Sequence, residues 1–383
     1  MKSVARTRGG RRILLKLWKR RRPMKKIFGK NPQSLGRIKF DRHTLLLLII
    51  FVVVMAFFSV VNSDKGFISG RSLTSMGLQL SEIGILAIAM MVTSLVGGIN
   101  LSIVAVANLG SVISGYFLFL NYPPEVAVGT TATFTNIKMP DDPSTWVLVI
   151  SLVIPLVIGI LSGILNGYLV GYVGVPPILA TLATMSVFTG LSAGITGGRT
   201  ITGFPEQFSV VANETVVGIP IPFILFIFLT AITFVILNHT TLGFKMRMVG
   251  TNDTASEFSG INNKAVIMKT YIMSGVLASI AGLIIMSRTM SAAYEYGSTT
   301  YVLLTILIGV LAGIQSGFGN VLNIFVSMLI LQALSTGFQM LLQTVRGSTF
   351  FKDFSWGVLL IIIFVINYLV RQKKTGVKKS SGQ

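Results

Sequence analysis

A short polar stretch between two long apolar ones decides the fold of this chain. Residues 240–261 read TTLGFKMRMVGTNDTASEFSGI, and they lie between the apolar segments 217–238 and 266–287. A run of about 20 apolar residues can cross the hydrocarbon core of a bilayer as a helix. The sequence therefore predicts two membrane-spanning helices joined by a polar loop outside the bilayer.

The composition extends this pattern to the whole chain. Of its 383 residues, 52% are hydrophobic and only 11% are charged, whereas a soluble domain carries about 25% charged residues. The repeated apolar runs predict an all-α, polytopic membrane protein with about ten spans. The expected spans lie at about 44–61, 81–97, 101–120, 146–170, 177–196, 217–238, 266–287, 301–315, 320–340 and 354–370.

Positive charge is concentrated at the N-terminus and gives the expected topology. Residues 1–43 contain 16 Lys and Arg and one acidic residue, and the net charge of the whole chain is +20. Lys and Arg collect on the cytoplasmic side of membrane proteins. We therefore expect a basic cytoplasmic segment 1–43, a transmembrane domain 44–370 with a cytoplasmic loop 239–265, and a basic cytoplasmic tail 371–383.

The basic segment 1–43 itself admits more than one role. It is interpreted as a topological anchor or as an arm that binds anionic membrane lipids. Nucleic-acid binding is disfavoured, because no base-reading fold accompanies the basic run.

The sequence lacks the motifs of several enzyme classes. It contains no P-loop of the form GxxxxGK[ST], no HExxH motif and no cysteine. The only two histidines, His43 and His239, lie at span ends, where an interfacial role is favoured over metal binding. No span has paired acids at its middle, which disfavours an intramembrane enzyme and a proton-coupled carrier. Glu82 is the nearest case, and its place near the outer membrane edge predicts a solvated carboxylate.

Uncharged polar residues within the spans have two interpretations. They could line a path for a neutral hydroxylated solute, or they could hold helices together by hydrogen bonds. As a set without charges, they suit a neutral solute better than an ion. Gly159 and Gly163, four residues apart, predict a helix-packing seam. The polar set comprises Asn100, Ser102, Asn108, Ser111, Asn166, Thr181, Thr184, Ser274, Gln332 and Gln339.

Several segments, taken in order, resemble a known family. They are GILAIAM at 84–90 with GGINLS at 97–102, GILNGYLV at 163–170, VPPILATLATM at 175–185, TGGRTI at 196–201, the Thr, Gly, Asn, Ala and SGI positions of 240–261, and the Ser-Gly and Ala-Gly pairs at 274–275 and 281–282. Together they are similar to the membrane permeases of bacterial ABC importers for monosaccharides of the ribose, xylose and arabinose type. The resemblance covers about residues 73–370.

Three departures from the family pattern leave the solute open. Asn100 stands where the family has Asp, and Ile103 to Ala105 stand where it has a glycine. Residues 294–298 match the family's acidic, alanine-rich segment poorly. Related permeases carry nucleosides, branched-chain amino acids or a sugar-like signalling molecule, so these solutes remain alternatives to a monosaccharide.

The resemblance implies the partners of the chain. A permease of this type lies in the bacterial inner membrane and works as a pair, formed by two identical chains or by this chain and a close relative. Two cytoplasmic ATPase subunits bind the ATP and Mg²⁺, so no cofactor is expected on this chain, and an external binding protein delivers the solute. The outside segments 121–145 and 197–216 are either contacts for an external partner or simple connections. A stand-alone facilitator or secondary carrier is the alternative from another class.

The polar loop is the expected contact with the ATPase. Asn252, or the residue before it, can cap a short helix, and Asp253 lies favourably at the positive end of that helix. Phe258 could fill an apolar groove on the ATPase, and Gly260 ends the helix. The residues expected in this ATPase-coupling loop are Gly243, Gly250, Asn252, Asp253, Ala255, Glu257, Phe258 and Gly260.

The expected translocation path starts at the interruption between the second and third spans. Broken helices are tolerated at membrane depth where they line a cavity, and the Gly97-Gly98 pair is followed closely by polar side chains. The residues expected along the path are Gly97, Gly98, Asn100, Ser102, Asn166, Pro177 and Thr181.

Overall fold

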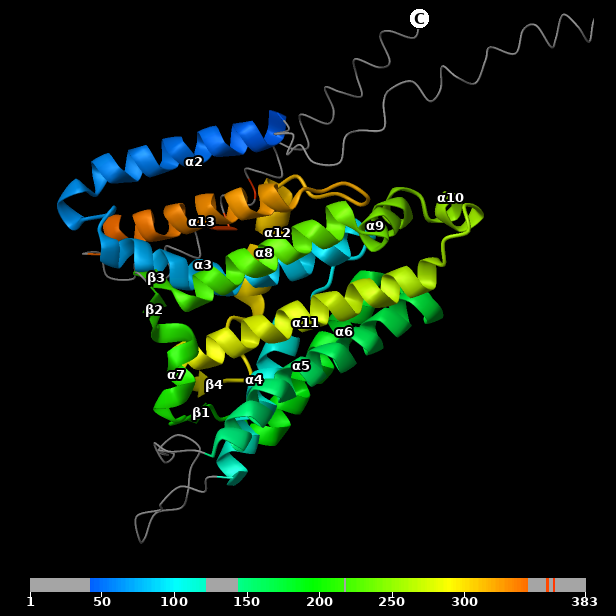
Figure 1. Ribbon diagram of the computed structural model, residues 1–383, viewed down its shortest axis with the longest axis horizontal. Helices are drawn as coiled ribbons and strands as arrows, with labels where there is room; N and C mark the ends of the chain where they lie inside the picture. The colour runs from blue at the N-terminus through cyan, green and yellow to red at the C-terminus, as the bar shows by residue number, and fades with distance from the viewer. Residues whose placement is uncertain (1–41, 122–143, 217, 344–355, 358–360, 362–383) are drawn as a thin grey trace, which may run out of the picture. The chain divides into compact units, whose positions relative to one another are not determined.

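The computed structural model describes residues 42–121, 144–216, 218–343, 356–357 and 361 (Figure 1). Outside the described residues lie nearly all of the basic segment 1–43, most of the outside segment 121–145, most of the tenth span at 354–370 and the tail 371–383. The expectations for these segments stay predictions.

The described part of the chain consists mainly of long apolar helices. Eight of the described helices are long and apolar enough to cross a membrane, which confirms an all-α polytopic membrane protein. They are α2 (Arg42–Val61), α3 (Gly70–Leu95), α4 (Ile103–Asn121), α5 (Thr145–Tyr168), α6 (Pro177–Thr196), α8 (Ile221–His239), α11 (Asn263–Thr289) and α13 (Val321–Leu341). A π-helical turn, η4 (Leu169–Val173), continues α5, and the 3-10 helix η3 (Ser63–Lys65) follows α2.

One expected span is much shorter than the helix observed, and another is matched by a helix that is short for a membrane span. The helix α3 begins at Gly70, well before the expected start at residue 81. The sequence places the start too late because the first turns of α3 contain polar side chains that lower the mean hydropathy there. Thr74, in these first turns, satisfies its hydroxyl within the helix by donating to the carbonyl of Gly70 at 2.9 Å. The span expected at 301–315 is α12 (Ser298–Leu311), which is shorter than a usual membrane span.

The polar loop after α8 folds into two short helices. The first is α9 (Thr241–Thr251), and the second is α10 (Asp253–Phe258). Asn252 caps α10, because its side-chain oxygen accepts a hydrogen bond from the backbone N–H of Ala255 at 2.9 Å. Of the two caps that the sequence allows, Thr251 and Asn252, the structure uses Asn252. Gly260 follows the helix with a φ of 80°.

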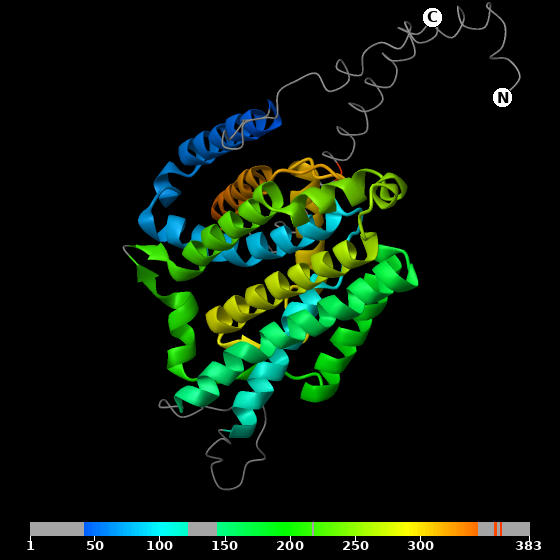
Figure 2. The same ribbon diagram turned by 45° about the vertical axis from the view of Figure 1, so that its right-hand side comes forward.

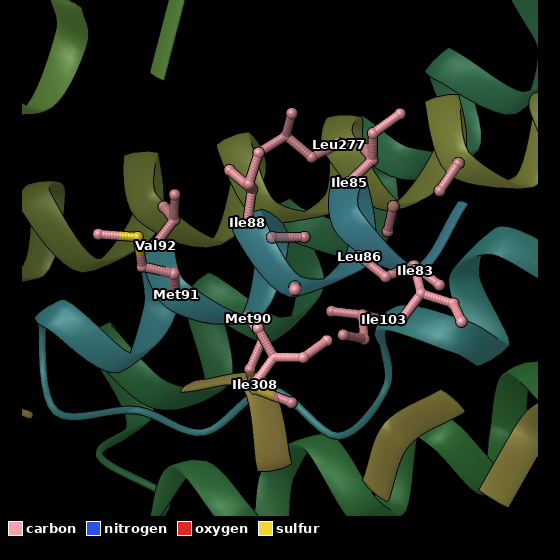
Figure 3. Close-up of a cluster of buried hydrophobic side chains, with 14 of the residues drawn as sticks. Ile83, Ile85, Leu86, Ile88, Met90, Met91, Val92, Ile103, Leu277 and Ile308 are labelled. Carbon is pink, nitrogen blue, oxygen red and sulfur yellow. The ribbon is translucent and has the colours of Figure 1, made fainter. Parts of the chain in front are cut away.

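The core is centred on α3, whose side chains are buried on every face over its second half. Figure 3 shows its isoleucine, leucine, methionine and valine side chains packed between neighbouring helices. Leu277 of α11, Ile103 of α4 and Ile308 of α12 contribute to the same cluster. A helix that is apolar all round belongs at the centre of a bundle, and α3 takes that place here.

The helices α5 and α11 lie side by side along most of their lengths (Figures 1 and 2). Gly163 faces α11 so closely that a Cβ atom on it would lie 2.5 Å from the Cα of Ile272. Gly159 meets the backbone of Gly275 in the same way. The seam predicted from the spacing of Gly159 and Gly163 is therefore confirmed, and it follows the rule that small residues let backbones approach in membrane proteins.

Short strands and one helix lie at the ends of α8 and α11 remote from α9 and α10 (Figure 1). They are β1 (Ile201–Thr202), α7 (Glu206–Asn213), β2 (Thr215–Val216), β3 (Ile219–Pro220) and β4 (Ser291–Ala292). The strand β1 pairs antiparallel with β4, and β2 pairs antiparallel with β3. They connect the helix ends on the side that the charge pattern predicts to be external.

Candidate functional site

The helix break at residues 96–102 separates α3 from α4, where the sequence predicts an interruption. Gly97 ends α3 with a φ of 88°, a left-handed conformation that glycine adopts without strain. A Cβ atom on Gly98 would lie 2.5 Å from the hydroxyl of Tyr271 and 3.4 Å from Pro177. The break is thus held tightly between α11 and the start of α6.

Five polar side chains join in one hydrogen-bonded network beside this break. Thr184 donates to the side-chain oxygen of Asn166 at 2.7 Å, and the amide of Asn166 donates to the Ser102 hydroxyl at 2.8 Å. Ser102 donates to the oxygen of Asn100 at 2.8 Å, and the amide of Asn100 donates to Ser274 at 3.1 Å. All five are buried. This polar network links α5, α6 and α11 to the helix break.

Thr181 extends the polar network to the backbone of the break. Its hydroxyl accepts a hydrogen bond from the N–H of Leu101 at 3.1 Å and lies 2.8 Å from the carbonyl of Pro177, to which it donates. The structure therefore brings together Gly98, Asn100, Ser102, Asn166, Pro177 and Thr181 of the expected path. Gly97 is the exception, because a Cβ on it would face Ser316 at 3.0 Å.

Tyr271 belongs to this site and was not among the residues expected from the sequence. Its side chain is fully buried, and its hydroxyl has no hydrogen-bond partner within the described part of the chain. A buried hydroxyl without a partner costs free energy and calls for an explanation. Its place beside Gly98 is a long-range contact between α11 and the break, which no local sequence pattern indicates.

The residues of the expected coupling loop divide into an inner and an outer set. Gly243 and Gly250 pack inward, and a Cβ on Gly250 would lie 2.5 Å from the backbone nitrogen of Gly317. The outer set, which is exposed, comprises Asn252, Asp253, Ala255, Glu257, Phe258 and Gly260. Phe258 has 89% of its surface exposed, so an aromatic ring stands free on a helix outside the spans.

Two hydrogen bonds fix α10 to the start of α11. Ser256, the buried residue of α10, donates to the side-chain oxygen of Asn263 at 2.7 Å. The amide of Asn263 in turn donates to the carbonyl of Asp253 at 2.7 Å. The exposed ring of Phe258 is therefore carried on a short helix with a defined attachment.

Arg247 fixes α9 on its other side. Its guanidinium donates to the carbonyl of Gly319 at 2.9 Å and to the side-chain oxygen of Asn238 at 3.2 Å. Burial lowers the pKa of the Arg247 guanidinium from its ordinary value, although an arginine remains protonated at physiological pH. The charge is thus held between α9, the end of α8 and the segment that precedes α13.

Glu82 lies in a different environment from the one predicted. Only 1% of its side-chain surface is exposed, and it forms an ion pair with Arg288 near the end of α11. The expectation of a solvated carboxylate is therefore wrong. The reason is a tertiary contact, since α11 and the loop after it cover this part of α3.

Comparison with known proteins relates this chain to transport permeases. A model of the family described as "Branched-chain amino acid transport system / permease component" matches residues 72–366. A ribose import permease protein of Haemophilus influenzae is 29% identical over 347 residues, which cover 89% of this chain and 97% of that protein. No solved structure matches the chain.

Two further relatives match over shorter lengths. A ribose import permease protein of Bacillus subtilis is 32% identical over 50% of this chain and 59% of that protein. An autoinducer 2 import system permease protein of Photorhabdus temperata is 30% identical over 44% of this chain and 53% of that protein. The resemblance to importer permeases is thereby confirmed, and the chain belongs to the branched-chain amino acid transport system permease family.

Proposed function

We propose that this chain is the membrane permease of an ATP-binding cassette importer for a monosaccharide in the bacterial inner membrane. The observation that carries the proposal is the relationship to a ribose import permease protein along nearly its whole length. The uncharged polar network at the helix break fits a solute that presents hydroxyl groups rather than net charge. A sugar-like signalling molecule is the second candidate, favoured by the autoinducer 2 import permease relative.

The polar network would contact the solute during transport. Its donors and acceptors now bond to one another across three helices. Separation of these helices would free the same donors and acceptors to bond to the hydroxyl groups of the solute. Hydrogen bonds to the solute would then replace the bonds lost between the network side chains. The expected path residues take this role, with Gly97 placed behind the path rather than in it.

ATP and Mg²⁺ would bind to a partner subunit and not to this chain. The sequence has no P-loop to cradle a nucleotide phosphate, so the chain itself would have no ATPase activity. The α9–α10 pair would receive the partner, with Phe258 as the apolar anchor, because buried aromatic residues dominate many protein interfaces. A second permease chain and an external binding protein would complete the complex.

The first experiment is co-purification from the native host followed by an ATPase assay. We expect an ATPase subunit to accompany the permease, and its turnover to rise when a sugar-loaded binding protein is added. Purification of the chain alone, with solute movement into liposomes without ATP, would refute the importer and support a secondary carrier.

The contact at Phe258 is tested by substitution at the same position. Phe258→Asp puts a charge where an apolar groove is expected, and it should uncouple ATP hydrolysis from uptake while the protein stays folded. Phe258→Leu keeps the apolar surface and serves as the control with near-normal uptake. Normal uptake in the Asp variant would refute the docking role.

The orientation of the chain can be tested with single cysteines, because the natural sequence has none. Both termini and the α9–α10 pair are proposed to be cytoplasmic. A cysteine replacing exposed Ser259 should react with a membrane-impermeant thiol reagent only after the cells are permeabilised. A cysteine replacing exposed Glu206 on α7 should react in intact cells, and the reverse pattern would invert the topology.

A further inference from the structure

The connection between α12 and α13 contains a tight turn at Gln315–Phe318. The backbone N–H of Gln315 donates to the carbonyl of Phe318 at 2.8 Å, and the N–H of Phe318 donates back to the carbonyl of Gln315 at 2.9 Å. Gly317 has a φ of 78°, which a glycine adopts without strain. Closed by hydrogen bonds in both directions, this turn has a fixed shape.

One side of the turn rests on the last turn of α9. Ser316 donates from its hydroxyl to the carbonyl of Gly250 at 2.6 Å. A Cβ atom on Gly317 would lie 2.8 Å from the backbone nitrogen of Thr251 and 3.0 Å from the carbonyl oxygen of Arg247. The turn is therefore in direct contact with both the backbone and the Thr251 side chain at the end of α9.

The other side of the turn closes the end of α3. The N–H of Gly317 donates to the carbonyl of Leu95, the last residue of that helix, at 2.9 Å. Carbonyl groups in the last turn of a helix lack partners within that helix. The turn Gln315–Phe318 therefore supplies a hydrogen-bond donor for one of these carbonyl groups. The Ser316 hydroxyl also lies 3.0 Å from where a Cβ of Gly97 would be. The turn thus touches α9 and the start of the helix break, and it lies beside a direct contact in which Gly250 of α9 packs against the carbonyl of Leu95.

We propose that the turn Gln315–Phe318, which buttresses the direct contact between Gly250 and Leu95, is a relay that carries movement of the α9–α10 pair to the helix break and its polar network. Leu95 lies only five positions before Asn100, the network member within the break. Close-packed contacts transmit small displacements because the interior has no free volume to absorb them. This inference rests on the proposed function, since the movement of α9–α10 is taken to come from a partner ATPase.

Ser316 and Gly317 are positioning residues in this account, because neither contacts solute or nucleotide. Ser316→Ala removes the hydrogen bond to α9 and leaves the backbone of the turn unchanged. Gly317→Ala forces a Cβ into the contact with Thr251 and Arg247, which separates the turn from α9, and it also strains the left-handed backbone of the turn. The two variants disturb the relay in different ways. An effect on uptake that both variants share is therefore assigned to the relay and not to a folding defect of one of them.

The experiment uses the full complex purified with its ATPase, reconstituted in liposomes with ribose-loaded binding protein. It measures three quantities for each variant, namely ATPase retained, basal hydrolysis, and the stimulation of hydrolysis and uptake by the binding protein. Loss of one hydrogen bond changes an equilibrium by about fivefold, so Ser316→Ala should lower the stimulation by about that factor. The retained ATPase and the basal rate should stay the same. Ser186→Ala is the control, because among the described residues that hydroxyl bonds only to the carbonyl of Leu182 within its own helix.

The outcomes separate the relay from the proposed function. Unchanged stimulation and uptake in both relay variants would overturn the relay while leaving the importer intact. Loss of the ATPase from Ser316→Ala would also overturn it, because the turn would then be part of the docking surface. If the unsubstituted chain retains no ATPase, the proposed function fails and the relay fails with it.

Discussion

Glu82 of α3 and Arg288 of α11 form an ion pair with a buried carboxylate and a partly exposed guanidinium, although 206 positions separate them in the sequence. Arg288 donates to both carboxylate oxygens, at 3.2 Å for the Nη2–Oε2 contact, and it also donates to the Tyr296 hydroxyl at 2.8 Å. The Tyr301 hydroxyl lies 3.5 Å from the Glu82 carboxylate and donates to it. One charged cluster thus ties α3 to the end of α11 and the beginning of α12.

Removing one charge of this pair should destabilise the protein strongly. Glu82→Gln leaves the partly exposed guanidinium of Arg288 without its counter-charge, and loss of hydrogen bonds between charged groups costs about 1.5–3 kcal/mol. We expect a clearly lower midpoint of thermal unfolding in detergent. The double variant Glu82→Leu with Arg288→Leu removes both charges and should recover much of the loss. A single variant as stable as the unsubstituted chain would show that the pair contributes little.

Two substitutions of Asn100 test whether transport needs the hydrogen bonds of the polar network. Asn100→Leu leaves Ser102 and Ser274 without their partner, which costs about 1–3 kcal/mol for each buried group left unsatisfied. Transport should fall sharply in this variant. Asn100→Asp keeps an acceptor for Ser102, and Ser274 can rotate its hydroxyl to donate instead, so uptake should be largely retained. Uptake measured in the same liposomes compares the two, and normal uptake by the Leu variant would exclude Asn100 from the path.

Tyr271→Phe should affect transport more than stability. The hydroxyl of Tyr271 has no partner in the described part of the chain, so its removal leaves no protein group unsatisfied and should not lower the unfolding temperature. If this hydroxyl bonds to the solute as it passes Gly98, the variant should show a raised solute concentration for half-maximal uptake. A stable variant with unchanged uptake would show that the hydroxyl does not contact the solute.

The seam between α5 and α11 should tolerate no added methyl group. In Gly163→Ala the new Cβ would lie 2.5 Å from Ile272, and overpacking of this kind costs about 1–3 kcal/mol. Gly190→Ala in α6 is the matched control, since a Cβ there would have nothing within 4 Å. That control should be neutral or more stable by up to about 1 kcal/mol, because alanine is the better helix former. Equal unfolding temperatures for the two variants would contradict the packing seen at the seam.

Local features of the sequence were sufficient for most of the fold. The long apolar runs predict the spanning helices, because burial in lipid depends on the composition of each run and not on its neighbours. The Gly97-Gly98 pair marks the helix break, and Asn252 marks the start of α10, because both act on the backbone within a few residues. The start of α3 was missed because polar side chains in its first turns are satisfied within the helix, as at Thr74.

The candidate site was only partly predictable, because the contacts that form it join residues far apart in the sequence. Asn100, Asn166 and Thr181 are recognisable as polar groups within spans, but only packing shows that the first two join one network and that Thr181 bonds to the backbone beside it. Gly97 was placed with them by its position in the chain, yet it faces the turn at Ser316. Tyr271 carries no local signal at all.

The sequence by itself determined that this chain is a helical membrane protein, where its helices are interrupted and which loop folds into a short exposed helix. These properties depend on hydropathy, glycine and capping residues close together in the chain. Only the tertiary structure decided that Glu82 pairs with Arg288 and that the turn Gln315–Phe318 contacts both α9 and the end of α3. Such contacts depend on which helix faces pack together, and the free energy of that packing is shared among residues far apart in the sequence.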